Sequence, residues 1–385
     1  MQIVKTIIIA ALSARAFVAD AVAAGYEVIA IDAFADVDTQ TVAKQAILVR
    51  QINGNFDTAD FLQKLAGIDC ANVTNFVYGS GFEGNIELLE LVAQRLPVFG
   101  NSAHIVAEIK HPINFFNTLD LLNIPYPEVC FSNLEHAQGW LLKQAGGSGG
   151  MHIQYASEGV ALNEGDYYQR KVLATSVSLL FLAHAQSVQV IGFNRQLIDA
   201  TEASPYRYAG AISHCPLAEA VKDKLIAYAT KLSKHYSLTG LNSLDAMVQM
   251  EGVDDNIWVL EINPRLSASF GLYEFEDAYL IDLHIQACSK DLTDCHLKDL
   301  PAVAQTSKAH HVFYAPCDVE VNEYSIWPEW VADIPMTNTV IKKGEPVCTA
   351  LADGISSDDA NELVVIRIQY LQSLFTAAIN ENNRN

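Results

Sequence analysis

The chain has 385 residues, of which 50 % are hydrophobic and 18 % are charged. This length and composition predict two or three folded domains and exclude disorder as the main state. Its 24 Lys and Arg residues against 45 Asp and Glu residues give a formal net charge of −21. A general nucleic-acid binder, or a protein held on an anionic membrane, needs a basic face, so this balance disfavours both classes.

Two further features indicate the compartment. The seven cysteines are scattered and contain no CxxC pair, so we expect reduced thiols. The apolar run at residues 6–12 is too short to span a membrane, and Arg15 and Asp20 follow where a signal peptide would be cleaved. We therefore expect a cytoplasmic protein.

The N-terminal part alternates between strand and helix patterns. A β-branched run at 3–11 is followed by a helix-favouring segment at 14–24 and a second apolar run at 26–31. The pattern recurs as a strand at 75–78 and a helix at 85–95. This order predicts a doubly wound α/β domain with a parallel sheet and a crevice at its strand ends.

From residue 140 onward the pattern changes to short strands separated by turns, which favours antiparallel sheets in an α+β arrangement. The expected strands lie at 140–143, 152–155, 167–169, 178–182, 243–249, 258–262 and 309–314, and the expected helices at 217–233 and 358–378. We expect residues 194–211 to be irregular and to contribute to a substrate pocket.

The stretch Trp258–Arg265, with the sequence WVLEINPR, is the most informative. An alternating strand places Glu261 and Asn263 on one face, and a hairpin turned at 251–256 brings Asp245 beside them. Such oxygen ligands suit Mg²⁺, and Arg265 just beyond the strand suits a phosphate or carboxylate. An ordinary edge strand with polar residues is the alternative, because motifs this short are often accidental.

Lys143 ends an apolar segment, and four glycines and a serine follow at 146–150. Backbone N–H groups in such a loop are able to close over phosphates while the lysine supplies a point charge. A flexible hairpin turn explains the glycines equally well. The strand at Tyr167–Val172 presents backbone groups that are able to read a purine, although a plain strand fits these residues too.

Taken in order, these motifs resemble the ATP-grasp superfamily, and within it the ATP-dependent carboligase-like proteins related to biotin carboxylase and to tyramine–glutamate ligase. The resemblance is carried by Ala14-Arg15, Asp32–Asp36, Tyr78–Glu83, Lys143 with Gly146–Gly150, Tyr168-Gln169 and Leu260–Arg265. It implies an N-terminal doubly wound domain followed by two α+β lobes that clamp ATP. The implied divisions are 1–105 for that domain, 106–180 for the small lobe, 181–300 for the large lobe and 301–385 for a C-terminal extension.

The resemblance also assigns site residues. Those implied to bind ATP are Lys143, Gly147, Ser148, Gly149, Gly150, Gln169, Arg170, Lys171 and Val172. Mg²⁺, or Mn²⁺ in its place, is implied to bind Asp245, Glu261 and Asn263, with Arg265 and Lys143 in catalytic roles. The hinge departs from the common pattern, since Ser176 stands near the place of a ribose-binding glutamate, so ribose contact and nucleotide preference stay open.

The implied activity is ATP-dependent joining of a small-molecule carboxylate to an amine through an acyl phosphate. Its narrowest form is glutamate addition to a tyramine- or tyrosine-like amine in one-carbon cofactor biosynthesis of the methanofuran type, as in methylotrophic bacteria. Alternatives are a biotin-carboxylase-like carboxylase and a non-catalytic ATP-binding relative. No nucleic-acid or membrane partner is expected, and relatives of this size are often homodimers.

Overall fold

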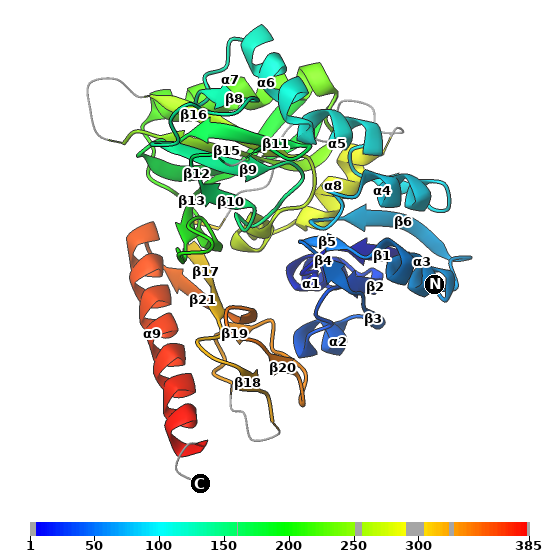
Figure 1. Ribbon diagram of the computed structural model, residues 1–385. Helices are drawn as coiled ribbons and strands as arrows, with labels where there is room; N and C mark the ends of the chain where they lie inside the picture. The colour runs from blue at the N-terminus through cyan, green and yellow to red at the C-terminus, as the bar shows by residue number, and fades with distance from the viewer. Residues whose placement is uncertain (1–4, 160, 251–255, 290–303, 323–326, 383–385) are drawn as a thin grey trace.

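The computed structural model of the chain describes residues 5–159, 161–250, 256–289, 304–322 and 327–382 (Figure 1). Three sheets of four or more strands organise this part of the chain. The first is parallel and lies in the N-terminal third, and the other two are antiparallel. The predicted α/β and α+β fold class is confirmed.

The parallel sheet has the strand order β3-β2-β1-β6-β7. Its strands are β1 (Thr6–Ala10), β2 (Glu27–Asp32), β3 (Gln45–Leu48), β6 (Val73–Tyr78) and β7 (Val98–Phe99). The accompanying elements are α1 (Arg15–Ala23), α2 (Val37–Val42), a hairpin of β4 (Gln51–Ile52) and β5 (Asn55–Phe56), α3 (Thr58–Ala66), α4 (Ile86–Ala93), α5 (Ala103–Lys110) and α6 (Pro112–Leu121). The central strand β1 is wholly apolar apart from Thr6 and buried along its length, as expected for a strand covered on both faces. The chain reverses direction across the sheet at β1, which places a crevice at its carboxyl end.

A smaller sheet with the order β10-β9-β11-β8 follows in the chain. Its strands are β8 (Val129–Cys130), β9 (Trp140–Gln144), β10 (Ile153–Tyr155) and β11 (Asp166–Arg170). The glycine-rich loop connects β9 to β10, whose register pairs Lys143 with Ile153. We call this sheet the small lobe.

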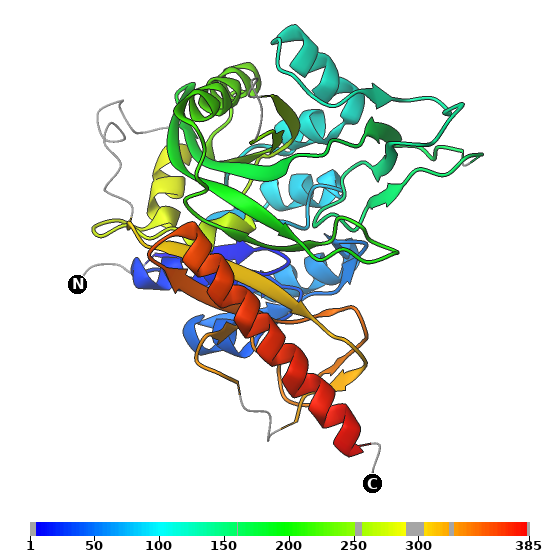
Figure 2. The same cartoon turned by 90° about the vertical axis from the view of Figure 1, so that its left-hand side faces the viewer.

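The third sheet has eight strands in the order β16-β15-β12-β13-β14-β17-β21-β19, and we call it the large sheet. Its strands are β12 (Thr175–His184), β13 (Ser187–Ile198), β14 (Tyr208–Ile212), β15 (Gly240–Val248), β16 (Ile257–Asn263), β17 (Ser307–Tyr314), β19 (Val331–Ala332) and β21 (Pro346–Gly354). Associated with it are α7 (Glu219–Tyr236), the 3-10 helix η1 (Ala268–Leu272), α8 (Leu280–Cys288), a strand pair of β18 (Val319–Glu320) and β20 (Val340–Ile341), and α9 (Ser357–Asn382). Helix α9 lies along β21 and β17 at the C-terminal end of the molecule (Figure 2).

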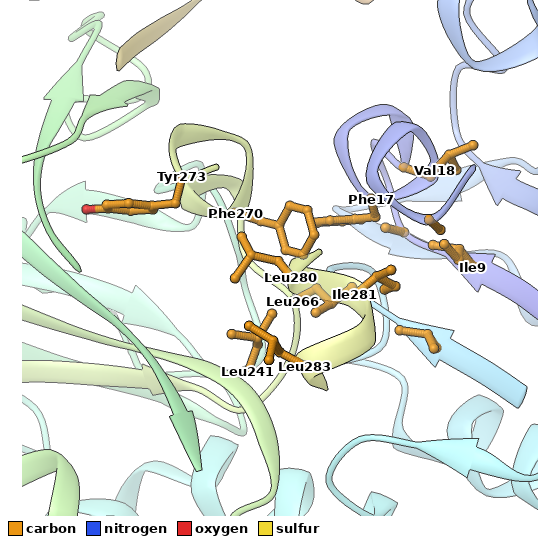
Figure 3. Packing of buried hydrophobic residues seen from close by; sticks show 14 of the residues in the cluster. Ile9, Phe17, Val18, Leu241, Leu266, Phe270, Tyr273, Leu280, Ile281 and Leu283 are labelled. Carbon is orange, nitrogen blue, oxygen red and sulfur yellow. The ribbon is translucent and has the colours of Figure 1, made fainter. Parts of the chain in front are cut away.

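A shared apolar core fixes the parallel sheet against the large sheet (Figure 3). Phe17 of α1 meets Phe270 of η1 edge to face, with ring centroids 5.0 Å apart. Ile281 and Leu283 of α8 belong to the same cluster, together with Leu241 of β15. Burial of these large side chains is worth about 1.5–3 kcal/mol each, so the two sheets form one packed body around the cleft described below.

The structure differs from the sequence-based expectation in two places. Residues 194–198 and 208–211 are not irregular, because they lie in β13 and β14, and only 199–207 connect those strands. Strands β17, β21 and β19 extend the large sheet instead of forming a separate layer. The division into four domains stays a prediction, and its boundary after residue 180 falls inside β12. Among the described residues, no helix is both long enough and apolar enough to cross a bilayer.

Candidate functional site

One cleft of about 1510 Å³ lies where the crevice of the parallel sheet meets the small lobe and the large sheet. Every site residue that the sequence assigned, apart from Gly147, lines this cleft. Gly147 borders a smaller cavity beside it, which also touches Lys143, His152 and Glu261. The sequence therefore places its candidate residues in one location, although they come from three different sheets or loops.

Strands β15 and β16 bring the predicted metal ligands together. Their antiparallel register sets Asp245 opposite Glu261 and Ser243 opposite Asn263. The Asn263 amide Nδ2 donates to Asp245 Oδ2 at 3.1 Å and to Glu261 Oε1 at 3.3 Å. The predicted turn of this hairpin, at 251–255, lies outside the described residues.

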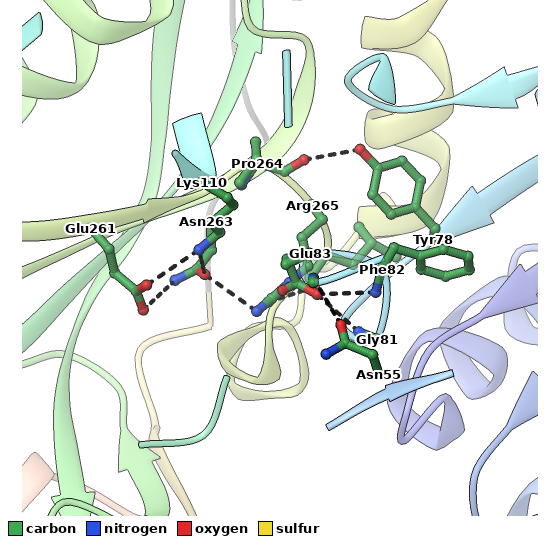
Figure 4. A network of polar contacts seen from close by, with 12 residues as sticks. Asn55, Tyr78, Gly81, Phe82, Glu83, Lys110, Glu261, Asn263, Pro264 and Arg265 are labelled. Carbon is green, nitrogen blue, oxygen red and sulfur yellow. Dashed lines mark hydrogen bonds and ion pairs between the residues drawn. The ribbon is translucent and has the colours of Figure 1, made fainter. Parts of the chain in front are cut away.

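Lys110, at the end of α5, approaches the same cluster from the N-terminal part of the chain (Figure 4). Its Nζ donates to Asn263 Oδ1 at 2.9 Å and to Glu261 Oε2 at 3.2 Å. The Lys110 side chain is only 9 % exposed, so this ammonium is held at the oxygen cluster. These oxygens therefore already attract one cation.

The two carboxylates differ in their electrostatic environment. Burial, and then the charge of Glu261, raise the pKa of Asp245 to about 7. Burial alone would raise the pKa of Glu261 as well, but Lys110 and Lys143 outweigh it and hold that pKa well below its ordinary range. Asp245 Oδ1 is buried and has no hydrogen-bond partner. An unpartnered buried carboxylate oxygen beside a second carboxylate and an amide fits a hard divalent cation such as Mg²⁺.

Arg265 is buried and ion-paired with Glu83, which follows β6 in the parallel sheet (Figure 4). Its Nη2 also donates to Asn263 Oδ1 at 3.3 Å, and its Nη1 donates to the Leu266 carbonyl at 3.1 Å. Glu83 in turn accepts from the backbone N–H groups of Gly81 and Phe82. A guanidinium has five N–H donors, so two of the five remain for a phosphate oxygen in the cleft.

The strand end that carries Arg265 is fixed by a second set of contacts. The Tyr78 hydroxyl donates to the Pro264 carbonyl at 3.3 Å, and Asn101 Nδ2 donates to the same carbonyl at 3.0 Å. Asn101 also donates to Asn242 Oδ1 at 2.8 Å. Residues of the parallel-sheet region thus hold the end of β16 in place.

Lys143 of β9 points into the cleft, where its Nζ donates to Gln169 Oε1 at 3.2 Å. Gln169 is 2 % exposed, and its Nε2 is buried without a partner. The Lys143 ammonium also lies 5.9 Å from the ring centre of Tyr167, on the same strand as Gln169. Strand β11 therefore orients the lysine that the sequence assigned to phosphate binding.

The glycine-rich loop is docked against two other segments. The Gly149 carbonyl accepts from the Tyr208 backbone N–H at 2.9 Å. Gly150 has φ +71°, and a Cβ there would lie 1.8 Å from the Tyr206 carbonyl oxygen. A Cβ on Gly146 would lie 2.8 Å from the Gly84 Cα atom. Glycine is required at Gly150 because the neighbouring backbone leaves no room for a side chain.

The predicted purine-reading segment has part of its backbone engaged. The Arg170 N–H donates to the Glu128 carbonyl at 2.8 Å, and the Lys171 N–H donates to the Gly139 carbonyl at 2.9 Å. The Arg170 guanidinium lies 4.3 Å from the ring centre of Trp140. A base edge in this part of the cleft would therefore meet the backbone at Val172 and beyond.

Sequence reasoning missed Lys110, Glu83 and His152. Burial and the charge of Lys143 lower the pKa of His152 to about 4, and its Nδ1 is buried without a partner. His152 directly follows the glycine-rich loop and Met151, so its position was the available signal. Lys110 and Glu83 reach the site from segments more than 150 residues away in the chain, which no local motif reveals.

Comparison with known proteins places this geometry in a family. Residues 113–269 match the model of the ATP-grasp domain. An uncharacterized protein of Methanocaldococcus jannaschii is 22 % identical over 354 residues, covering 85 % of this chain and 83 % of that protein. This relative does not carry a known activity.

Solved structures agree in fold. Biotin carboxylase of Campylobacter jejuni gives a TM-score of 0.68 at 13 % identity, covering 92 % of this chain and 88 % of that one. N5-carboxyaminoimidazole ribonucleotide synthetase of Thermotoga maritima gives 0.64 at 13 % identity, covering 95 % and 98 %. The biotin carboxylase domain dimer of Hydrogenobacter thermophilus 2-oxoglutarate carboxylase, in complex with MgADP and bicarbonate, gives 0.65 at 11 %, covering 89 % and 85 %. Residues 113–269 of this chain are therefore an ATP-grasp domain, set in a chain that shares its whole fold with these ATP-grasp carboxylases and synthetases.

Proposed function

We propose that this protein is an ATP-dependent ligase that joins a small-molecule carboxylate to an amine through an acyl phosphate. The observation that carries the proposal is the convergence of Lys143, Asp245, Glu261 and Arg265 on one cleft. Two buried carboxylates, an amide and two cations are the groups needed to hold a triphosphate with its metal ion. A silent nucleotide-binding relative has no physical need for such a costly buried set.

In the first proposed step, a carboxylate oxygen of the substrate attacks the γ-phosphorus of ATP. The bond from that phosphorus to the β,γ-bridging oxygen breaks, and ADP leaves with the electron pair. In the second step, the amine nitrogen attacks the acyl carbon, inorganic phosphate leaves, and one proton is released from nitrogen. A bound magnesium ion would supply charge neutralisation of the phosphate oxygens, with Asp245, Glu261 and Asn263 as the residues to hold it.

The chain's own residues have separate tasks in this scheme. Lys143, oriented by Gln169, places a positive charge beside the phosphates. Arg265 keeps two N–H donors for the transferring group while Glu83 fixes its plane. The glycine-rich loop covers the phosphates and keeps water away from the acyl phosphate, because water competes with the amine.

In its narrowest form the proposal is glutamate addition to a tyramine- or tyrosine-like amine, as in cofactor biosynthesis of the methanofuran type. Support for this form is the sequence resemblance alone. A second candidate activity is ATP-dependent carboxylation with bicarbonate, and the fold shared with biotin carboxylases supports it. We place the protein among cytoplasmic enzymes that act on small molecules, with a homodimer as the expected assembly.

The test is a substrate screen with ATP and Mg²⁺, read by ADP release, phosphate release and product mass. One arm pairs carboxylates, including L-glutamate, with amines, including tyramine, and a second arm supplies bicarbonate and free biotin. Glu261→Gln serves as the inactive control, and Glu219→Gln, on the exposed face of α7, serves as the matched control with wild-type activity. An amide product supports the ligase, and bicarbonate-dependent release in the second arm replaces it with the carboxylase. Absence of ATP binding by calorimetry would overturn both.

A further inference from the structure

A tyrosine and a histidine form a hydrogen-bonded pair on the cleft wall. Tyr208 begins β14 and His310 lies on the adjacent strand β17. The Tyr208 hydroxyl and His310 Nε2 are 2.8 Å apart, and both residues line the cleft. None of the tasks assigned above uses this pair.

The backbone of Tyr208 is held on both sides. Its N–H donates to the Gly149 carbonyl at 2.9 Å, and its carbonyl accepts from the Tyr314 hydroxyl at 2.7 Å. The first contact ties Tyr208 to the docked glycine-rich loop, and the second ties it to β17. The position of the hydroxyl is therefore coupled to closure of the loop over the cleft.

The pair lies between two charged ends of the cleft. Burial raises the pKa of the Tyr208 hydroxyl, and Asp245 adds to this while Arg265 opposes it, so the hydroxyl lies within electrostatic range of the proposed phosphate end. On the other side, Arg15 of α1 is ion-paired with Asp333 at 2.7 Å, and both line the cleft near His310. The pair thus lies between the phosphate end and the carboxyl edge of the parallel sheet.

The charged groups around His310 favour its neutral form. Burial and then Arg15 lower the pKa of His310 to about 4, with a further lowering contribution from His311, while Asp333 acts in the opposite direction. At neutral pH the imidazole is therefore uncharged and able to accept a proton at Nε2 from a hydroxyl. Asp333 would stabilise the imidazolium that results, and bound phosphates would do so as well.

We infer that Tyr208 and His310 relay the proton that the acceptor amine loses as it attacks the acyl phosphate. As the bond between nitrogen and the acyl carbon forms, the Tyr208 oxygen takes a proton from nitrogen and passes its own proton to His310 Nε2. The bond from the acyl carbon to the phosphate oxygen breaks, and phosphate leaves with the electron pair. The imidazolium then returns its proton to solvent. This inference rests on the proposed ligase function and assigns residues to its second step.

The experiment separates the two steps of the reaction. Formation of the acyl phosphate is followed by ¹⁸O positional isotope exchange in ATP with L-glutamate and Mg²⁺ but no amine. Amide formation is followed by product mass after tyramine is added. We expect Tyr208→Phe and His310→Ala to keep isotope exchange within about threefold of wild type and to lose amide formation by about 100-fold, the lower range for general-base catalysis.

Controls and rescue distinguish a proton relay from a structural role. His311→Gln is the matched control, since His311 neighbours His310 on β17 but does not line the cleft. Added imidazole should restore amide formation to His310→Ala, and the residual rate of Tyr208→Phe should rise with pH more steeply than that of wild type. Equal loss of isotope exchange and amide formation, or absence of both rescue and the steeper pH profile, would refute the relay but not the ligase. Absence of isotope exchange and amide in the wild type would overturn the ligase in this form together with the relay.

Discussion

Replacing Glu83 by alanine removes one partner of a buried ion pair and leaves Arg265 without a counter-charge. The Glu83 side chain is 3 % exposed and that of Arg265 is 9 % exposed, so water cannot replace the lost carboxylate. Removing one partner of a buried pair costs about 3–5 kcal/mol. Gly81 and Phe82 also lose the acceptor for their N–H groups, which moves the expectation toward the upper part of this range.

The comparison variant is Glu128→Ala, which breaks the ion pair with Arg170. These side chains are 65 % and 44 % exposed, and an exposed pair contributes at most about 1 kcal/mol. Urea denaturation at pH 7, followed by circular dichroism, gives the free energy of unfolding for both variants and wild type. Domains of ordinary stability unfold at about 5–15 kcal/mol, so Glu83→Ala should remove a third or more of that. If both variants lose the same free energy, the Glu83–Arg265 pair does not stabilise the fold and the reasoning fails.

Three other predictions concern the cleft. Glu261→Gln should reduce turnover below detection while the urea midpoint stays near that of wild type, because it removes a metal-facing charge at a strand end; unchanged turnover would contradict the metal assignment. Gly150→Ala should weaken ATP affinity measured by calorimetry, since the added Cβ meets the Tyr206 carbonyl, whereas Gly149→Ala, whose Cβ would have nothing within 4 Å, should have a smaller effect; equal effects would show that loop docking is unimportant. Asp245→Asn should gain stability relative to wild type as pH rises from 4 to 7, because the folded carboxyl, with its pKa raised to about 7, binds a proton that the unfolded chain releases near pH 4. A pH-independent difference in urea stability between the two proteins would refute this last prediction.

Local pattern was sufficient to predict the fold class and the pairing of Asp245 with Glu261. Strand alternation placed Glu261 and Asn263 on one face, and a simple hairpin aligned Asp245 with them, as the register confirms. The position of His310 on a strand was also predictable, but its hydroxyl partner was not. That contact depends on β14 and β17 being neighbours, and the segment between them includes residues that the structure does not describe.

What the sequence did not reveal depends on contacts between distant segments. Lys110 reads as an ordinary basic residue in the last turn of a helix, where a lysine is favoured by the helix dipole. Glu83 reads as one polar residue in a glycine-containing turn. Their roles follow from how the parallel sheet packs on the large sheet, which is a property of the apolar core. Periodicity describes one element at a time and carries no information about such packing.

The fastening of Arg265 to Glu83 has a consequence for how this protein is able to change. The guanidinium that faces the cleft is also the one that joins the parallel sheet to the end of β16. A substitution there alters chemistry and cohesion in the same event, so neither property is free to drift alone. Variation that tunes substrate choice is therefore expected at the wall formed by β14 and β17 and the loop at 199–207, where the peptide chain carries no such double duty.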